Sequence, residues 1–193
     1  LLALLAIGGM VLYNYALRPY YNQRDFDRLQ SLYQSGNSLS AGVEIPANTP
    51  AGMLPQFYAL YQENADIGGW IQIPDTKISY PVMQSVPGRD YSRLNFQRQA
   101  SLFGVPYFDK AAALISPQSV NRSLVIYGNN AAGGQMFAQL TGYMDAGFLT
   151  GHPVVEMNTI YHNRKWVVFA VMIVDEAKAD GGFNYRQSVF ADG

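Results

Sequence analysis

From Ile67 onward, the chain consists of short apolar runs separated by turn residues, and this pattern restricts the fold more than any other feature. The runs are rich in β-branched and aromatic residues, as β-strands are. They occupy residues 69–73, 77–83, 104–109, 123–128, 153–157 and 165–174. Pro81 indicates that part of the second strand lies at a sheet edge, because proline cannot donate to a strand ladder. Residues 134–149 instead carry apolar side chains at helical spacing. We therefore predict a mainly β fold, a barrel or sandwich, with one helix between strands.

Two further helices are expected before this region. Residues 20–34 place apolar side chains at helical spacing with charges between them. Residues 39–50 contain glycine and two prolines, which is typical of a linker. Thr49 is expected to cap a second helix that begins at Pro50 and runs to about Asn64.

The amino-terminal 13 residues carry no charge, and Arg18 is the first charged residue. A complete membrane span needs about 20 apolar residues, so this run is short for one. We expect residues 1–17 to be the remaining part of a transmembrane anchor, because no cleavage site typical of a signal peptide follows them. The alternative is the core of such a signal peptide. Either reading makes the rest of the chain extracytoplasmic.

Four tyrosines close to this run have the character of an interfacial aromatic belt. They are Tyr13, Tyr15, Tyr20 and Tyr21. The expected domain organisation is a partial anchor over 1–17, a membrane-proximal helix and linker over 18–50, and a β-domain over 51–193.

Charge and composition exclude several classes of function. The chain has 13 basic and 14 acidic residues, so it lacks the excess of positive charge that is typical of nucleic-acid-binding proteins. Cysteine is absent, which excludes a disulfide framework, a cysteine zinc site and a cysteine nucleophile within these residues. With only His152 and His162, a histidine-rich metal cluster is excluded too. We expect neither a metal nor a cofactor, and we expect a structural hydrogen-bonding role for His152.

Five motifs occur in an order that points to a known family. They are NADIGGWIQIPDTKISYPVMQ (64–84), DYSRLNF (90–96), SLFGVPYFD (101–109), LVIYGNNAAGGQMFAQLTGYMDAGFLTGHPVVEMNT (124–159) and FNYRQSVF (183–190). Together they resemble the class B sortases, which are membrane-anchored cysteine transpeptidases of Gram-positive bacteria. The resemblance implies a sortase-like β-barrel, incomplete at its carboxyl end.

The resemblance also implies a reaction and partners. In the family, a cysteine thiolate attacks the threonyl carbonyl of a sorting signal, a histidine transfers protons, and an arginine steadies the oxyanion or the peptide. The implied partners are the sorting-signal peptide of a surface protein and an amine acceptor on peptidoglycan or a pilin. The implied location is the cell membrane, with one span and the domain on its extracytoplasmic face.

Two departures from the family pattern bear on activity. Asn129 stands where the family has its catalytic histidine, and an amide cannot act as a general acid or base. The sequence ends at Gly193, and the family's cysteine and arginine strands are not in it. We interpret this as truncation and expect these 193 residues to be inactive in transfer. The alternative is a catalytically dead sortase-like module for extracellular binding or scaffolding.

Two tyrosines are candidates for binding the peptide. Tyr127 lies in the strand that leads to Asn129, and Tyr91 lies in the second quoted motif. Aromatic side chains beside an active-site strand can line a peptide groove. Plain core packing is the alternative for both.

Overall fold

The computed structural model describes residues 2–13, 17–38, 44–110, 117–118 and 124–173. Its helices, including 3₁₀ turns marked η, are α1 (Leu2–Leu12), α2 (Arg18–Asn37), η2 (Pro55–Phe57), α3 (Tyr58–Glu63), η3 (Ala132–Gly134), η4 (Phe137–Met144) and α4 (Ala146–Gly151). Its strands are β1 (Ile67–Gln72), β2 (Ser79–Met83), β3 (Tyr107–Phe108), β4 (Ile126–Tyr127), β5 (Asn130–Ala131), β6 (Gln135–Met136), β7 (Val154–Thr159) and β8 (Lys165–Val167).

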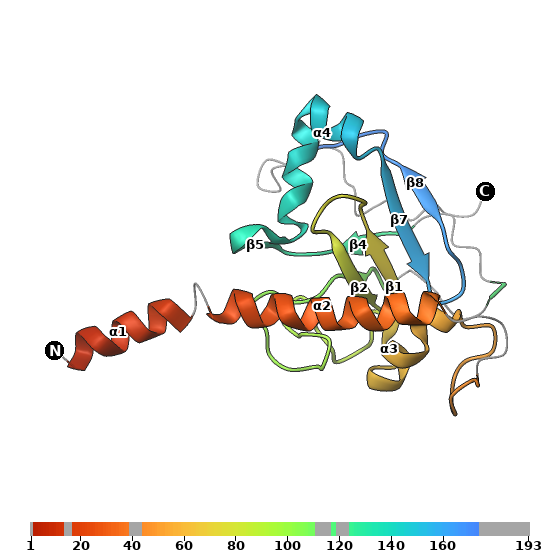
Figure 1. Cartoon of the computed structure of the whole chain (residues 1–193), viewed down its shortest axis with the longest axis horizontal. Coiled ribbons are helices and arrows are strands. Elements are labelled where there is room, and N and C mark those ends of the chain that lie inside the picture. The colour runs from red at the N-terminus through yellow and green to blue at the C-terminus, as the bar shows by residue number, and fades with distance from the viewer. Residues whose placement is uncertain (1, 14–16, 39–43, 111–116, 119–123, 174–193) are drawn as a thin grey trace.

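Six strands form one curled sheet in the order β4-β3-β2-β1-β7-β8, which resembles half of a barrel (Figure 1). All neighbouring pairs are antiparallel except β2 and β3, which are parallel. In the part of the chain that the structure describes, β3 pairs with β2 only at Met83. Pro81 faces Trp70 of β1. Strand β2 is an internal strand of the sheet and not an edge strand, but its pairing with β3 in the described residues is confined to Met83, so the missing N–H of Pro81 interrupts no ladder there. The mainly β prediction is confirmed.

Helix α2 lies across the sheet, while α1 projects away from the body of the molecule (Figure 1). Phe26, Leu29 and Tyr33 lie on one face of α2 and are buried. The predicted helix over 20–34 is therefore confirmed and is longer at both ends. Near its end, Gly36 allows a close approach to η2, because a Cβ there would lie 2.6 Å from Cα of Gln56.

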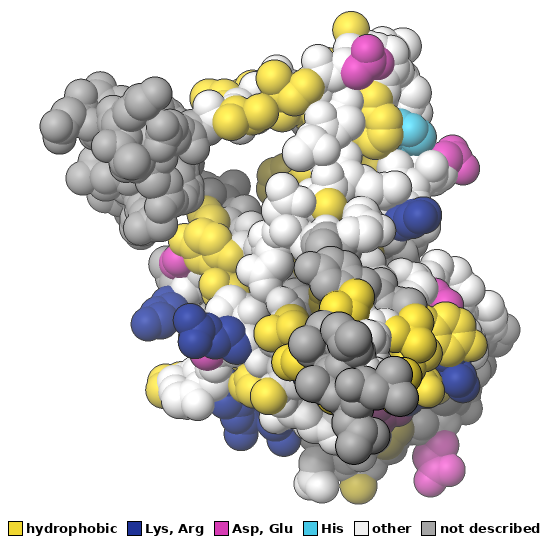
Figure 2. Space-filling view, turned by 90° about the vertical axis from the view of Figure 1, so that its left-hand side faces the viewer, with side chains coloured by type: hydrophobic (Ala, Val, Ile, Leu, Met, Phe, Trp, Pro, Cys, Tyr) yellow, Lys and Arg dark blue, Asp and Glu magenta, His cyan; other side chains and the backbone are white. Residues whose placement is uncertain are grey.

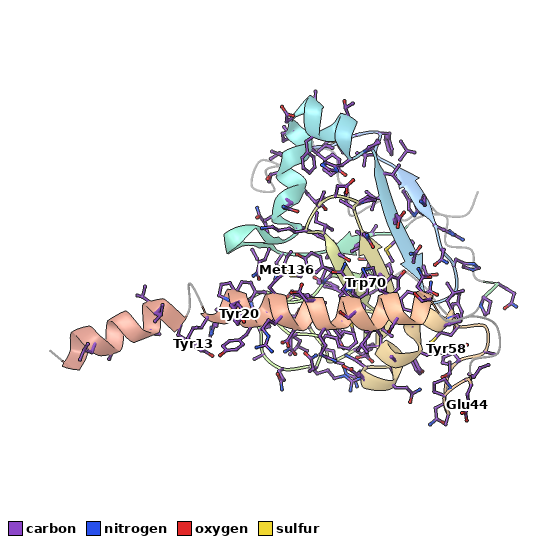
Figure 3. All side chains as sticks on the ribbon, in the orientation of Figure 1. Tyr13, Tyr20, Glu44, Tyr58, Trp70 and Met136 are labelled. Carbon is purple, nitrogen blue, oxygen red and sulfur yellow. The ribbon has the colours of Figure 1, made fainter. Side chains whose placement is uncertain are left out.

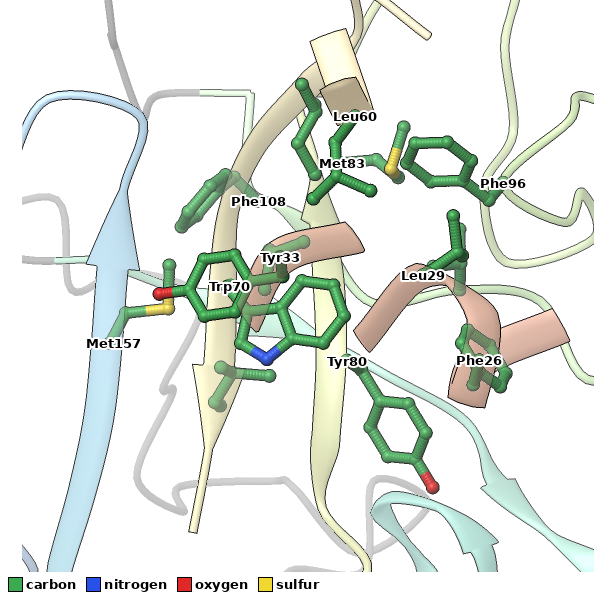
Figure 4. Packing of buried hydrophobic residues seen from close by; sticks show 14 of the residues in the cluster. Phe26, Leu29, Tyr33, Leu60, Trp70, Tyr80, Met83, Phe96, Phe108 and Met157 are labelled. Carbon is green, nitrogen blue, oxygen red and sulfur yellow. The ribbon is translucent and has the colours of Figure 1, made fainter. Parts of the chain in front are cut away.

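The core lies between α2 and the sheet (Figure 4). The rings of Trp70 and Tyr33 stack with their centroids 4.6 Å apart and an angle of 7° between their planes. Nε1 of Trp70 donates a hydrogen bond of 3.1 Å to Oγ of Ser79. Phe26 packs edge-on against Tyr80, with 4.9 Å between the centroids. Aromatic contacts of this kind tie the helix to β1 and β2.

The helix predicted from Pro50 to Asn64 is wrong at its start. Leu54 has extended backbone angles (φ −73°, ψ 139°), and a 3₁₀ turn begins only at Pro55. A residue before proline avoids the helical region, because the proline ring collides with its backbone. Pro55 therefore sets the boundary that Thr49 was expected to set.

The helix predicted over 134–149 is present but divided. A 3₁₀ helix, η4, ends at Met144, and α4 begins after Asp145. The Asp145 side chain accepts a 2.9 Å hydrogen bond from the backbone N–H of Phe148 and so caps α4. The predicted strand over 165–174 is shorter, because β8 ends at Val167.

Among the described residues, no helix is both long and apolar enough to cross a bilayer. The motif at 183–190 and Tyr15 lie outside the described residues. The expected anchor over 1–17 and the domain boundaries remain predictions.

Candidate functional site at Asn129

Asn129 lies in the short connection between β4 and β5. Gly128 precedes it, and a Cβ there would lie 2.3 Å from the Phe137 ring, so only glycine fits without displacing that ring. The backbone carbonyl of Asn129 accepts a 3.0 Å hydrogen bond from the Phe137 N–H. Strand β4 and the start of η4 thus hold the Asn129 backbone from two sides.

The Asn129 side chain joins two parts of a distant loop. Its Nδ2 donates to the backbone oxygen of Ser92 at 2.9 Å and to that of Phe103 at 3.0 Å. Both amide hydrogens are therefore in use. Gly104 follows Phe103 with φ +63°, and a Cβ there would lie 2.5 Å from the Ser92 oxygen. The loop can close on Asn129 because this position is glycine.

A cleft of about 890 Å³ opens beside Asn129. One wall is the region around the start of α2, and the other is the loop between β2 and β3. The lining residues are Tyr13, Arg18, Tyr21, Asn22, Asp25, Ser92, Arg93, Asn95, Gln99, Ala100, Ser101, Leu102, Phe103 and Asn129. This volume is within the usual range for a ligand site, roughly 300–1,000 Å³.

Tyr127 is half-buried and outside the lining of this cleft. Its hydroxyl donates a 2.9 Å hydrogen bond to Oδ2 of Asp109, and its ring centroid lies 5.4 Å from that of Tyr107. These contacts orient β4 toward β3. A peptide-binding role for Tyr127 stays a prediction.

Tyr91 lies in the core, where its side chain is 1% exposed. Its hydroxyl donates to Oδ2 of Asp66 at 2.5 Å and accepts from Nδ2 of Asn64 at 3.1 Å. A groove role does not fit this placement, whereas the core-packing alternative does. Burial raises the pKa of the Tyr91 hydroxyl, and the hydrogen bond to Asp66 raises it further.

The curated proteins to which this chain is similar include two sortase B proteins. No family model matches the chain. Sortase B of Staphylococcus aureus is 31% identical over 116 residues, which is 60% of this chain and 46% of that protein. Sortase B of Listeria monocytogenes is 32% identical over 112 residues, or 58% of this chain and 44% of that protein.

Solved structures also show similarity to sortase B. A sortase B–substrate complex from S. aureus superposes with a TM-score of 0.67 at 26% identity, covering 80% of this chain and 66% of that one. A Bacillus anthracis protein described as similar to sortase B gives a TM-score of 0.66 at 26% identity, covering 78% of this chain and 66% of that one. The chain is a class B sortase homologue. It spans somewhat less than half the length of the two curated relatives.

A buried carboxylate of this sortase homologue supports the loop beneath Asn129. Asp66 lies just before β1 and accepts hydrogen bonds through Oδ2 from Arg89 and Tyr91, while Nε of Arg98 lies 3.4 Å away. Asn64 joins the group by accepting a 2.6 Å hydrogen bond from Nη2 of Arg98. The network fastens the loop over 89–98, which includes Ser92.

Sequence reasoning missed this network. The acidic residues of the region are scattered along the chain, and the partners of Asp66 lie 23 to 32 residues away from it. Within the described residues, no group of acidic and histidine side chains could hold a metal ion. The available signal was the pair of arginines, Arg89 and Arg98, that flank the motif at 90–96. Both side chains contact Asp66 in the structure.

We expect the class B sortase homologue to lose stability in acid through Asp66. Burial alone would raise the pKa of this carboxyl, but the Tyr91 hydrogen bond and the two guanidinium groups outweigh burial and hold its pKa below the ordinary value. The unfolded chain then binds the proton more readily, with a pKa of about 3.9, so the stabilisation is present above about pH 4 and is lost as pH falls through the folded-state value.

The variant Asp66→Asn isolates this effect. It should lower the free energy of unfolding at pH 7 by about 2 kcal/mol, since a charge-assisted hydrogen bond in the core is lost and the arginines, being partly exposed, contribute less. Urea unfolding between pH 3 and pH 7 should then show a shallower acid decline than in the wild type. Parallel pH profiles for the two proteins would contradict this assignment.

His152 is placed as expected for a structural residue. Its Nδ1 lies 3.0 Å from the carbonyl oxygen of Pro74, and its ring packs 4.4 Å from that of Phe148. It does not line the cleft at Asn129. The chemistry available at Asn129 is therefore hydrogen bonding and positioning, because an amide neither gives nor takes a proton in the working range.

Proposed function

We propose that this chain recognises a sorting-signal peptide in the cleft at Asn129 as part of a class B sortase-type transpeptidase. The observation on which this proposal depends is the similarity to sortase B in both sequence and fold, together with a cleft beside Asn129, the residue that the sequence resemblance assigns to the family's histidine position. The relative of known structure that was solved with its substrate supports a peptide as the ligand.

Transfer needs groups that these 193 residues do not contain. A thiolate must attack the threonyl carbonyl, and an acid must protonate the departing amine before a second amine attacks the thioester. Because the sequence has no cysteine and has Asn129 at the histidine position, we propose that these residues bind the peptide but do not transfer it. For the complete transpeptidase, the proposed acceptor of the peptide is an amine on peptidoglycan or a pilin.

A second candidate is a binding or scaffolding module without catalysis. The contacts of Asn129 favour it, because both of its amide hydrogens hold the loop over 92–103 and leave none for a substrate. The carbonyl oxygen of this amide can accept a hydrogen bond but cannot exchange a proton.

Membrane anchoring through residues 1–17 is part of the proposal. The uncharged run from Leu2 to Leu12 is helical, and several of its apolar side chains are exposed, including Met10 and Leu12. An anchor there would hold the cleft near the bilayer surface, since Tyr13 and Arg18 line the cleft. Flotation of the intact chain with phosphatidylglycerol vesicles, but not of a form lacking residues 1–17, is the expected result; equal flotation would contradict it.

Peptide binding and transfer can be measured separately. Fluorescein-labelled, threonine-containing sorting-signal peptides should raise fluorescence anisotropy saturably when titrated with the detergent-solubilised chain. Mixed with triglycine, the same peptides should give no joined product by mass spectrometry. Absence of binding by every peptide would refute the proposed recognition, and a thioester or a joined product would refute the proposed lack of transfer.

A further inference from the structure

The start of α2 lies directly along the cleft at Asn129. Arg18, Tyr21, Asn22 and Asp25 line it, and their spacing of three and four residues puts them on one face of the helix. We propose that this face is one wall of the peptide site and that Arg18 and Tyr21 bind the peptide. The inference rests on the proposed function and assigns part of the binding energy to the membrane-proximal helix.

The helix wall is tied to the segment that carries Asn129. Gln135 donates through Nε2 to the backbone oxygen of Pro19 at 2.8 Å and accepts through Oε1 from Nδ2 of Asn22 at 2.7 Å. Strand β6, which contains Gln135, pairs with β5, which begins at the residue after Asn129. In Figure 3, Met136 lies beside the amino-terminal half of α2. A single side chain thus links the helix wall to the segment that carries Asn129.

Farther along α2, the same row of residues is buried in the core. Phe26 and Leu29, the next residues in the Asn22 row, are buried against the sheet. The cleft-facing residues are thus placed by the same core packing that fixes the helix. The wall is preorganised, which lowers the entropic cost of binding a flexible peptide.

The chemistry of the two walls suits an extended peptide. On α2, the Arg18 guanidinium lies 5.0 Å from the centre of the Tyr13 ring, and the Tyr21 ring is 53% exposed. The facing loop contributes the amides of Asn95 and Gln99 and the 72% exposed Leu102. Guanidinium and amide groups hydrogen-bond to peptide carbonyls, and aromatic and aliphatic surfaces cover peptide side chains.

Charge on this end of the molecule agrees with such a ligand. Figure 2 looks at the end from which α1 projects and shows Lys and Arg side chains gathered beside hydrophobic ones. In the cleft itself the charged lining residues are Arg18, Arg93 and Asp25, and the two guanidinium groups are complementary to peptide carbonyls, which are acceptors.

The helix offers a matched control for each proposed contact. Tyr20 is 57% exposed, close to the value for Tyr21, and its ring packs edge-on against that of Tyr21 with 5.6 Å between the centroids, but it does not line the cleft. Arg24 lies 5.9 Å from the centre of the Tyr20 ring, and this pair repeats the Arg18–Tyr13 pair outside the cleft. The variants Tyr21→Ala and Arg18→Gln can therefore be compared with Tyr20→Ala and Arg24→Gln.

The experiment titrates one labelled sorting-signal peptide with each of the four variants in detergent and follows anisotropy. Tyr21→Ala and Arg18→Gln should each raise Kd about five- to tenfold, as tyrosine and arginine contacts at binding sites commonly do. Tyr20→Ala and Arg24→Gln should change Kd less than about twofold, and circular dichroism should show four equally folded proteins.

Three outcomes would overturn the inference. Equal losses in the cleft variants and their controls would mean a general effect on α2. No loss in any of the four, with a loss in Leu102→Ala, would place the peptide on the loop wall alone. If Tyr20→Ala and Tyr21→Ala both weaken flotation with vesicles while peptide affinity is unchanged, the tyrosines contact lipid. Failure of the wild-type chain to bind any peptide is a distinct result, since it refutes the proposed function itself.

Discussion

In a chain extended by the family's cysteine and arginine strands, replacing Asn129 with histidine should raise the rate of peptide transfer roughly 10²- to 10⁴-fold. The reason is the proton: histidine titrates near neutrality, so it can protonate the departing amine and take a proton from the incoming one. The imidazolium form would also favour the thiolate of a nearby cysteine. Mass spectrometry of the joined product, with a labelled sorting peptide and triglycine, measures the rate.

The same change should have a structural cost. The amide of Asn129 donates to two carbonyl oxygens, those of Ser92 and Phe103, whereas one nitrogen of an imidazole can donate to only one acceptor. Loss of one such hydrogen bond should lower the free energy of unfolding by about 1 kcal/mol. Urea unfolding of Asn129→His and of the wild type checks this.

The adjacent asparagine is the matched control. Asn130 is exposed, so Asn130→His introduces the same ring one residue away from the proposed acid–base position. It should leave both transfer and stability close to the wild-type values. If Asn129→His does not raise transfer, or if Asn130→His raises it as much, Asn129 does not occupy the acid–base position of the family.

Replacing Trp70 with alanine should lower the free energy of unfolding by about 3–5 kcal/mol, the usual cost of removing a buried tryptophan. Its ring is 1% exposed, stacks on Tyr33 of α2, and donates a hydrogen bond to Ser79 of β2. One substitution therefore opens a cavity, leaves the Ser79 hydroxyl without its donor, and separates the helix from two strands. Urea unfolding followed by circular dichroism measures the change.

The chain offers a second tryptophan for comparison. Trp166 lies on β8 and is 38% exposed, so Trp166→Ala should cost about 1 kcal/mol or less. Similar losses for the two variants would mean that the core between α2 and the sheet is not the main source of stability.

Local patterns predicted the regular elements well where one face of an element is buried. The apolar spacing that ends at Tyr33 predicted α2, and the spacing of η4 and α4 predicted a helical segment, although Asp145 divides it. These signals are local, because burial on one face imposes a period of 3.6 or 2 residues. The same logic missed the start of the helix near Pro55, where a backbone collision outweighed a capping signal.

The sites of single side chains were harder to predict. Tyr91 could have lined a groove or filled the core, and the choice depends on Asp66, which lies 25 residues earlier in the chain. The partners of Asn129 are backbone carbonyls 37 and 26 residues earlier, and a carbonyl leaves no mark in a sequence. Long-range pairing of this kind is set by the path of the whole chain.

The sequence by itself determined the family, the strand-rich class and the chemical limit at position 129, because motif order, apolar period and the identity of a functional group are all carried by the residues alone. Only the tertiary structure decided that the Asn129 amide clamps the loop over 92–103, that Tyr91 supports that loop from the core, and that the start of α2 faces the same cleft. The physical reason is that these are contacts between segments far apart in the chain, formed when the core of α2 and the sheet closes around Trp70.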